Sequence, residues 1–90
     1  MTAEKRFSLD EAKRIGDALG FDWHAFDVAQ FQAGLEVELE HGARDAQTNV
    51  TNDDALIIGK IALAHLKEFP DYYTHLSAME KEADEYWANV

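Results

Sequence analysis

The stretch Leu56–Leu66 constrains the fold more than any other segment, because its apolar side chains nearly encircle it when it is drawn as a helix. A rotation of about 100° per residue places Lys60 and Lys67 together on one side of this helix and His65 opposite them. A helix that is apolar on most sides is covered by other parts of its chain. No apolar run approaches the roughly 18 residues that span a bilayer. We therefore expect a central helix, with His65 on its most buried face and no contact with a membrane.

Start and stop signals for helices divide the rest of the chain, and no segment alternates with the period of a strand. Capping residues mark the starts and helix breakers mark the ends, namely Ser8 with Glu11, Asp27, Thr51 with Asp54, Gly20, Gly42 and Pro70. The sequence predicts an all-α fold, a compact bundle of about four helices. Their approximate ranges are 9–19, 28–41, 52–68 and 71–87, with a short aromatic connector at 21–26.

Length and composition indicate one soluble domain over residues 1–90, with a frayed N-terminus at 1–7. The chain has no cysteine and no segment resembling a signal peptide, so we expect a cytoplasmic protein. Eighteen acidic residues against eight basic ones give a formal net charge of −10. This balance disfavours direct binding to nucleic acid. It leaves a basic protein as a partner, and one way to bind such a partner is an acidic surface that imitates nucleic acid.

The helix expected at 71–87 has one apolar stripe, which we predict to be core because aromatic residues and methionine at helical spacing usually are. Its members are Tyr72, Leu76, Met79, Ala83, Tyr86 and Val90, with Trp87 alongside. An exposed apolar patch around Trp23 or Trp87 would instead indicate an interaction module. A homodimer is a further way to cover such a patch.

Two pairs of residues carry the most chemistry, Glu38-x-x-His41 and His65-x-x-Glu68. Positions three apart project from the same helix face, so we predict that these four side chains approach one another between the second and third helices. Two carboxylates and two imidazoles suit one divalent metal ion, with iron, manganese and zinc as candidates. The last helix adds Glu80, Tyr72 and Tyr73 as oxygen donors.

The alternative reading uses the same residues as a buried hydrogen-bond network. Buried polar groups are normally satisfied by protein partners, which favours the network over the metal. The sequence offers no catalytic residues: Ser8 is a helix cap and Ser77 falls on an outer face. We expect a non-enzymatic binding domain whose Glu/His/Tyr cluster holds a divalent metal, or else a protein-interaction module whose cluster is structural.

Four motifs carry a resemblance to a known family that extends over nearly the whole chain: AKRIGDALG at 12–20, GLEVELEHG at 34–42, NVTNDD at 49–54 and GKIALAHLKEFPDYYT at 59–74. The chain resembles a family of small bacterial and phage proteins known only as a domain of unknown function. The resemblance implies a single small domain. It carries no activity, cofactor or site residues over to this sequence.

Overall fold

The computed structural model describes residues 7–52 and 54–89, which form four helices and no strand. The helices are α1 (Leu9–Ala18), α2 (Val28–Arg44), α3 (Ala55–Glu68) and α4 (Tyr72–Ala88). The predicted all-α fold is thus confirmed, with each helix near its expected position. In the described part of the chain, no helix has both the length and the apolar character needed to cross a membrane.

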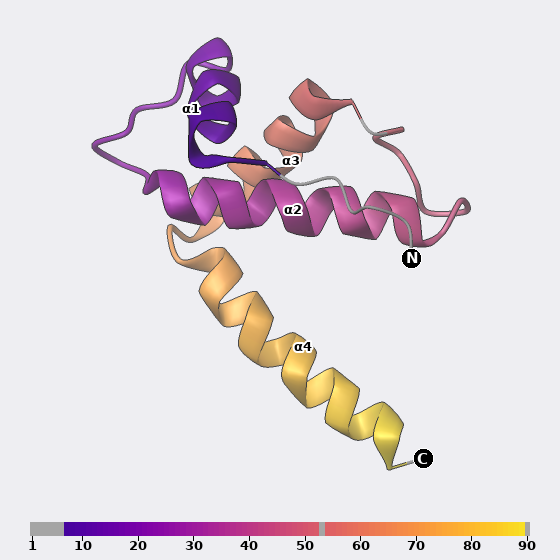
Figure 1. The fold of residues 1–90 in the computed structure, drawn as a ribbon. Helices are drawn as coiled ribbons and strands as arrows, with labels where there is room; N and C mark the ends of the chain where they lie inside the picture. Colours follow the sequence, from indigo (N-terminus) through magenta and orange to yellow (C-terminus); the bar gives the residue numbers. More distant parts are fainter. Residues whose placement is uncertain (1–6, 53, 90) are drawn as a thin grey trace.

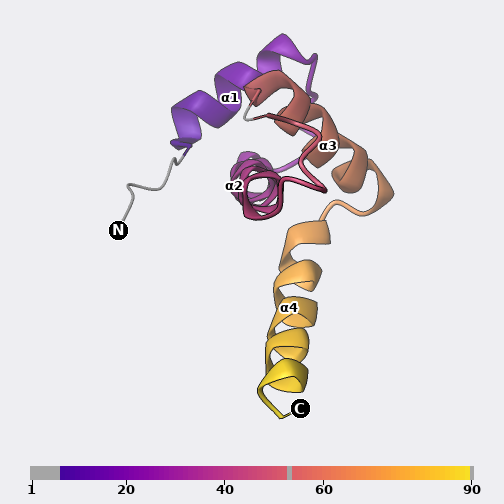
Figure 2. The ribbon, with the colours of Figure 1, turned by 90° about the vertical axis from the view of Figure 1, so that its right-hand side faces the viewer.

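The helices are arranged around α2, which contacts each of the other three (Figures 1 and 2). Figure 2 views α2 nearly end-on, with α1 and α3 arching over one side of it and α4 leaving from the other. We expected the helix at 52–68 to be central; α3 does contact each of the other three helices, but α2 is the helix that lies between the α1 and α3 side and α4. The first turn of α3 reaches solvent instead, with Leu56 and Ile57 both exposed.

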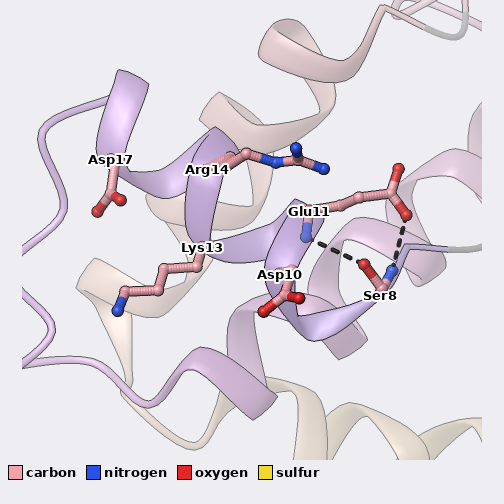
Figure 3. A pocket seen from close by; sticks show the side chains of 6 residues that line it. All are labelled: Ser8, Asp10, Glu11, Lys13, Arg14 and Asp17. Carbon is pink, nitrogen blue, oxygen red and sulfur yellow. Dashed lines mark hydrogen bonds between the residues drawn. The ribbon is translucent and has the colours of Figure 1, made fainter.

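The start and end of α1 follow the signals in the sequence. The Ser8 side chain accepts a hydrogen bond from the Glu11 amide at 3.1 Å, and the Glu11 carboxylate accepts one from the Ser8 amide at 3.0 Å (Figure 3). Together these bonds form the predicted capping box, which satisfies two amides at the helix start. Gly20 has a φ of 81°, so the expected left-handed stop is also present.

The second helix starts as predicted, because the Asp27 side chain accepts a hydrogen bond from the Ala29 amide. The predicted stop at Gly42 was wrong, since α2 continues to Arg44. A Cβ atom on Gly42 would lie 2.8 Å from Thr51 Oγ1. This glycine therefore lets the following loop approach the helix. The prediction failed because glycine is used both at helix stops and where two segments pack closely.

The third helix starts three residues later than predicted, at Ala55. The Asp54 carboxylate accepts hydrogen bonds from the amides of Leu56 at 2.9 Å and Ile57 at 3.1 Å, so Asp54 is the N-cap. Thr51, the expected cap, is buried and donates to Asn49 Oδ1 instead. The start of a helix has free amide groups, and a carboxylate can accept hydrogen bonds from two of them, whereas a hydroxyl accepts from one. The carboxylate is therefore the better cap.

The core lies where α1, α2 and α3 meet, with one contribution from α4. Its buried apolar residues are Phe7, Ala12, Phe31, Leu35, Leu39, Ile58, Ala62, Leu66 and Tyr73. Phe7 was expected in a frayed segment, but its carbonyl accepts a hydrogen bond from Gln32 Nε2 at 2.8 Å. Residues 1–6 of that segment lie outside the described residues. Trp23 packs its ring over Gly16, which confirms the connector at 21–26 as an edge of the core.

The apolar stripe of α4 is only partly used by the core, so its prediction as core was wrong for most of its length. Tyr72 and Leu76 pack against the core, whereas Met79 is 55% exposed, Tyr86 60% and Trp87 70%. Figures 1 and 2 show why: the helix crosses α2 near its own start and then extends away from the other helices. Val90, the last expected member, lies outside the described residues.

Candidate functional site

A single carboxylate, that of Glu38, joins three of the four helices. Glu38 comes from the middle of α2, His65 from the last turn of α3 and Tyr73 from the first turn of α4. Glu38 is only 7% exposed and Tyr73 only 4%. A carboxylate this deeply buried is costly to desolvate unless it is hydrogen-bonded, so its partners are an essential part of the fold.

The chain brings Tyr73 to this point by ending α3 abruptly and packing the next helix closely. Phe69 and Pro70 separate the two helices, because the residue before a proline disfavours helical geometry. The Tyr73 ring then lies on Gly34 of α2, where a Cβ atom would sit 2.5 Å from Tyr73 Cε2. The absence of a side chain at residue 34 therefore sets how closely α4 packs on α2.

The three side chains meet at one oxygen atom of Glu38. The Tyr73 hydroxyl donates to Glu38 Oε2 at 2.8 Å, and His65 Nδ1 lies 3.0 Å from the same atom. His65 Nδ1 is also 3.1 Å from the Tyr73 hydroxyl oxygen. An unprotonated Nδ1 would turn its lone pair toward a carboxylate, so this geometry places a proton on Nδ1 and makes His65 a second donor to Glu38.

The Tyr73 hydroxyl is held in its neutral, donating form. Burial raises the pKa of Tyr73 well above its usual range, and the hydrogen bond to the Glu38 carboxylate raises it further. Ionised Tyr73 would put a second negative charge beside Glu38 in a buried position. The hydroxyl therefore remains a donor at neutral pH.

The sequence placed His65 on the most buried face of its helix, but the structure leaves it half-buried. Its side chain is 28% exposed, while Ile58, Ala62 and Leu66 take the most buried face of α3. The His65 ring stacks flat on Tyr72, with centroids 4.3 Å apart and an angle of 6° between the planes. Tyr72 and Tyr73 thus hold the imidazole from two directions, one through its face and one through Nδ1.

His41 extends the cluster toward solvent. Its Nε2 atom lies 3.3 Å from Glu80 Oε2 on α4, and its Nδ1 atom lies 3.9 Å from Glu38 Oε1. The side chains of His41 and Glu80 are each 41% exposed, so this contact is weaker than the buried one. It nevertheless adds another tie between α4 and α2, two turns beyond Tyr73.

The predicted approach of Glu38, His41 and His65 is therefore present, but Glu68 does not join them. Glu68 is exposed at the end of α3, and its side chain makes no hydrogen bond or ion pair with another described residue. Within residues 7–52 and 54–89, no group of three or more histidine, aspartate or glutamate side chains has the geometry to hold a metal ion. The Tyr73 hydroxyl and His65 Nδ1 both lie within hydrogen-bond distance of Glu38 Oε2.

Two further contacts at the start of α4 escaped the sequence reasoning. Gln30 Nε2 donates to Thr74 Oγ1 at 2.6 Å, linking α2 to α4 next to Tyr73. The close packing at Gly34 is the other, because a glycine inside a helical pattern indicates a close approach without naming the neighbour. The hollow along α1 shown in Figure 3 is lined by exposed side chains of residues 8–17 alone, and we regard it as open surface.

The fold and the cluster define a class: a small all-α protein in which a buried Glu–His–Tyr network fixes a projecting C-terminal helix. The chain belongs to the family described as "Protein of unknown function (DUF5661)", whose match covers residues 12–82. That range includes Glu38, His41, His65, Tyr73 and Glu80. No curated protein and no solved structure matches the chain.

Proposed function

We propose that this protein is an interaction module whose projecting helix, α4, docks with a basic amphipathic helix of a partner protein. The observation that carries the proposal is the apolar stripe of α4, which leaves the core and continues into solvent through Met79, Tyr86 and Trp87. Large apolar side chains exposed along one stripe are typical of protein-interaction surfaces.

The spacing of the stripe favours a helix as its partner. Leu76, Met79, Ala83 and Tyr86 follow one another at intervals of three, four and three residues, the pattern of the a and d positions in a coiled coil. Such a seam accepts the side chains of a second helix between its own. Only about one and a half heptads are free, from Met79 to Ala88, so we expect an affinity in the micromolar range or weaker.

The charges beside the stripe favour a basic partner. In the heptad set by Leu76 and Met79, Glu80 takes an e position and Glu82 a g position, the places where charges decide which helices pair. A second copy would bring its own acidic α4 against these glutamates, and both chains carry a net charge of −10. A helix with lysine or arginine at its e and g positions complements them.

The Glu38 cluster has a structural role in this proposal. Tyr73 and Thr74 fix the first turn of α4 through Glu38 and Gln30, and Glu80 adds a contact two turns later. These bonds hold the helix at a defined angle to α2, so the free half is presented in one orientation. Fixing a binding element before the partner arrives lowers the entropy lost on binding.

The test is a titration with a synthetic amphipathic helix of about three heptads that has leucine at a and d and lysine at e and g. We expect saturable binding, followed by the fluorescence of Trp87 in a Trp23→Phe background. Met79→Glu places a charge on the seam and should weaken binding at least tenfold. The matched control is Ala78→Glu, which adds the same charge to the neighbouring exposed residue outside the stripe and should bind like the parent.

Three results would contradict the proposal. A peptide with glutamate at e and g that binds as tightly as the lysine peptide would show that charge does not select the partner. Sedimentation showing a stable homodimer that Met79→Glu dissociates would assign the stripe to a second copy of the chain. Equal binding by the Met79→Glu and Ala78→Glu variants would remove the stripe from the interaction.

A further inference from the structure

A half-open pocket of about 420 Å³ lies where the loop after α2 folds back against the C-terminal end of that helix. It is separate from the hydrophobic stripe of α4, since no residue of α4 lines it. Its walls come from α2, the loop and one residue of α3, namely Glu38, His41, Gly42, Arg44, Asp45, Thr48, Val50, Thr51 and Ile61. The absence of a side chain at Gly42 shapes this pocket, because it lets the loop approach the helix.

The two oxygen atoms of Glu38 are used differently. Oε2 accepts from Tyr73 and His65, and neither of these residues lines the pocket. Oε1 accepts no hydrogen bond from another described residue, and its ion-pair contact is His41 Nδ1 at 3.9 Å, on the pocket side. Among the side-chain nitrogen and oxygen atoms of the described residues, Gln30 Oε1 is the one fully buried atom that lacks a partner. Glu38 Oε1 is therefore not fully buried, and Glu38 lines the pocket.

We infer that this pocket binds a primary ammonium group carried on a short alkyl chain. Glu38 offers a negative charge at the buried end of the pocket, and Asp45 adds another at its rim. Val50 and Ile61 provide apolar walls for an alkyl chain. A site that is concave, partly apolar and equipped with a few fixed polar groups has the features of a small-ligand site.

The geometry selects ammonium over other charged groups. Two carboxylates repel anions. A guanidinium group binds best through two parallel hydrogen bonds to both carboxylate oxygens, but Glu38 has only Oε1 free. A compact ammonium needs one strong acceptor, which Oε1 supplies. Arg44, the arginine in the lining, donates to Glu40 Oε1 at 3.1 Å and so does not occupy the pocket's carboxylates.

The ammonium group has two sources, a free small amine or the lysine side chain of a partner protein. The inference concerns α2 and its loop, so it stands independently of the docking proposed for α4. The probe for the first source is n-butylammonium, which is the end of a lysine side chain. The probe for the second is a short peptide with one central lysine, compared with the same peptide carrying norleucine.

The experiment follows backbone amide chemical shifts while n-butylammonium chloride replaces sodium chloride at constant ionic strength. We expect saturable shifts at Gly42, Thr51 and Ile61, with a millimolar Kd for so small a ligand. 1-Butanol, which has a similar shape and no charge, should shift them at least tenfold less. Glu38→Gln keeps an acceptor for Tyr73 and should weaken binding at least tenfold.

A second variant guards against loss of fold in the Glu38→Gln protein. Asp45→Asn retains the acceptor for the Gln47 amide, removes only the charge at the rim, and should weaken butylammonium binding several-fold. Tighter binding of the lysine peptide than of butylammonium would identify a protein partner as the source, and equal binding would identify a free amine. Shifts that never saturate, that spread over the whole acidic surface, or that persist unchanged in both variants would overturn the inference.

Discussion

Replacing Tyr73 by phenylalanine tests whether the Glu38 cluster holds the helices together. The change removes one hydroxyl group from a residue that is only 4% exposed. That hydroxyl donates a hydrogen bond to the buried Glu38 carboxylate at 2.8 Å. A hydrogen bond to a charged group contributes about 1.5–3 kcal/mol to stability. His65 remains as a donor to Glu38, so we expect a loss of about 2 kcal/mol. For a domain of this size that lowers Tm by about 10 °C.

The assay is urea unfolding at pH 7, followed by circular dichroism at the helix band. The matched control is Tyr72→Phe, one residue away, because the Tyr72 hydroxyl makes no hydrogen bond with another described residue and its ring stacks on His65. We expect that control to change the free energy of unfolding by less than about 0.5 kcal/mol. A Tyr73→Phe protein as stable as the Tyr72→Phe protein would refute the claim that the cluster is a buried, charge-assisted network.

Three further outcomes follow from the same structure. Above pH 10 the unfolded chain releases the Tyr73 proton while the folded protein keeps it. The unfolding free energy measured by urea titration should therefore fall by up to about 1.4 kcal/mol per pH unit. The Tyr73→Phe protein should lack this contribution to the dependence of the unfolding free energy on pH. Gly34→Ala puts a methyl group 2.5 Å from Tyr73 Cε2 and should cost about 1–3 kcal/mol in the same assay; an unchanged free energy of unfolding would contradict the close packing of α4 on α2. Asp54→Ala removes the α3 cap and should cost about 1 kcal/mol, whereas Asp54→Asn should retain most of the stability. Equal losses for the two Asp54 variants would contradict the capping role.

The parts of the fold that the sequence predicted correctly depend on neighbours within one helical turn. The Ser8–Glu11 box and the stop at Gly20 are local contacts, and both are present. The stop predicted at Gly42 failed because that glycine accommodates Thr51, nine residues away along the chain. A residue type alone does not distinguish a left-handed turn from a close packing contact.

The candidate site was predictable to a similar extent. Helical geometry correctly placed Glu38 near His65, because each projects from its helix toward the other. It named Tyr72 and Tyr73 as donors but could not decide which of them would complete the cluster, since this depends on the angle at which α4 crosses α2. The same angle explains the error over Met79 and Trp87: an apolar stripe indicates a buried surface, and the sequence does not say where the neighbouring helix ends.

The projection of α4 also divides that helix into two parts of unequal protection against hydrogen exchange. Its first two turns are held by Tyr73, Thr74 and Glu80, so their amides should open only when the cluster breaks. The turns from Lys81 to Ala88 lack such contacts with other helices and are shorter than an isolated helix needs to be stable in water. Their amides should exchange within the fastest class of the protein, and a partner helix seated on the stripe should slow them while leaving the first two turns unchanged.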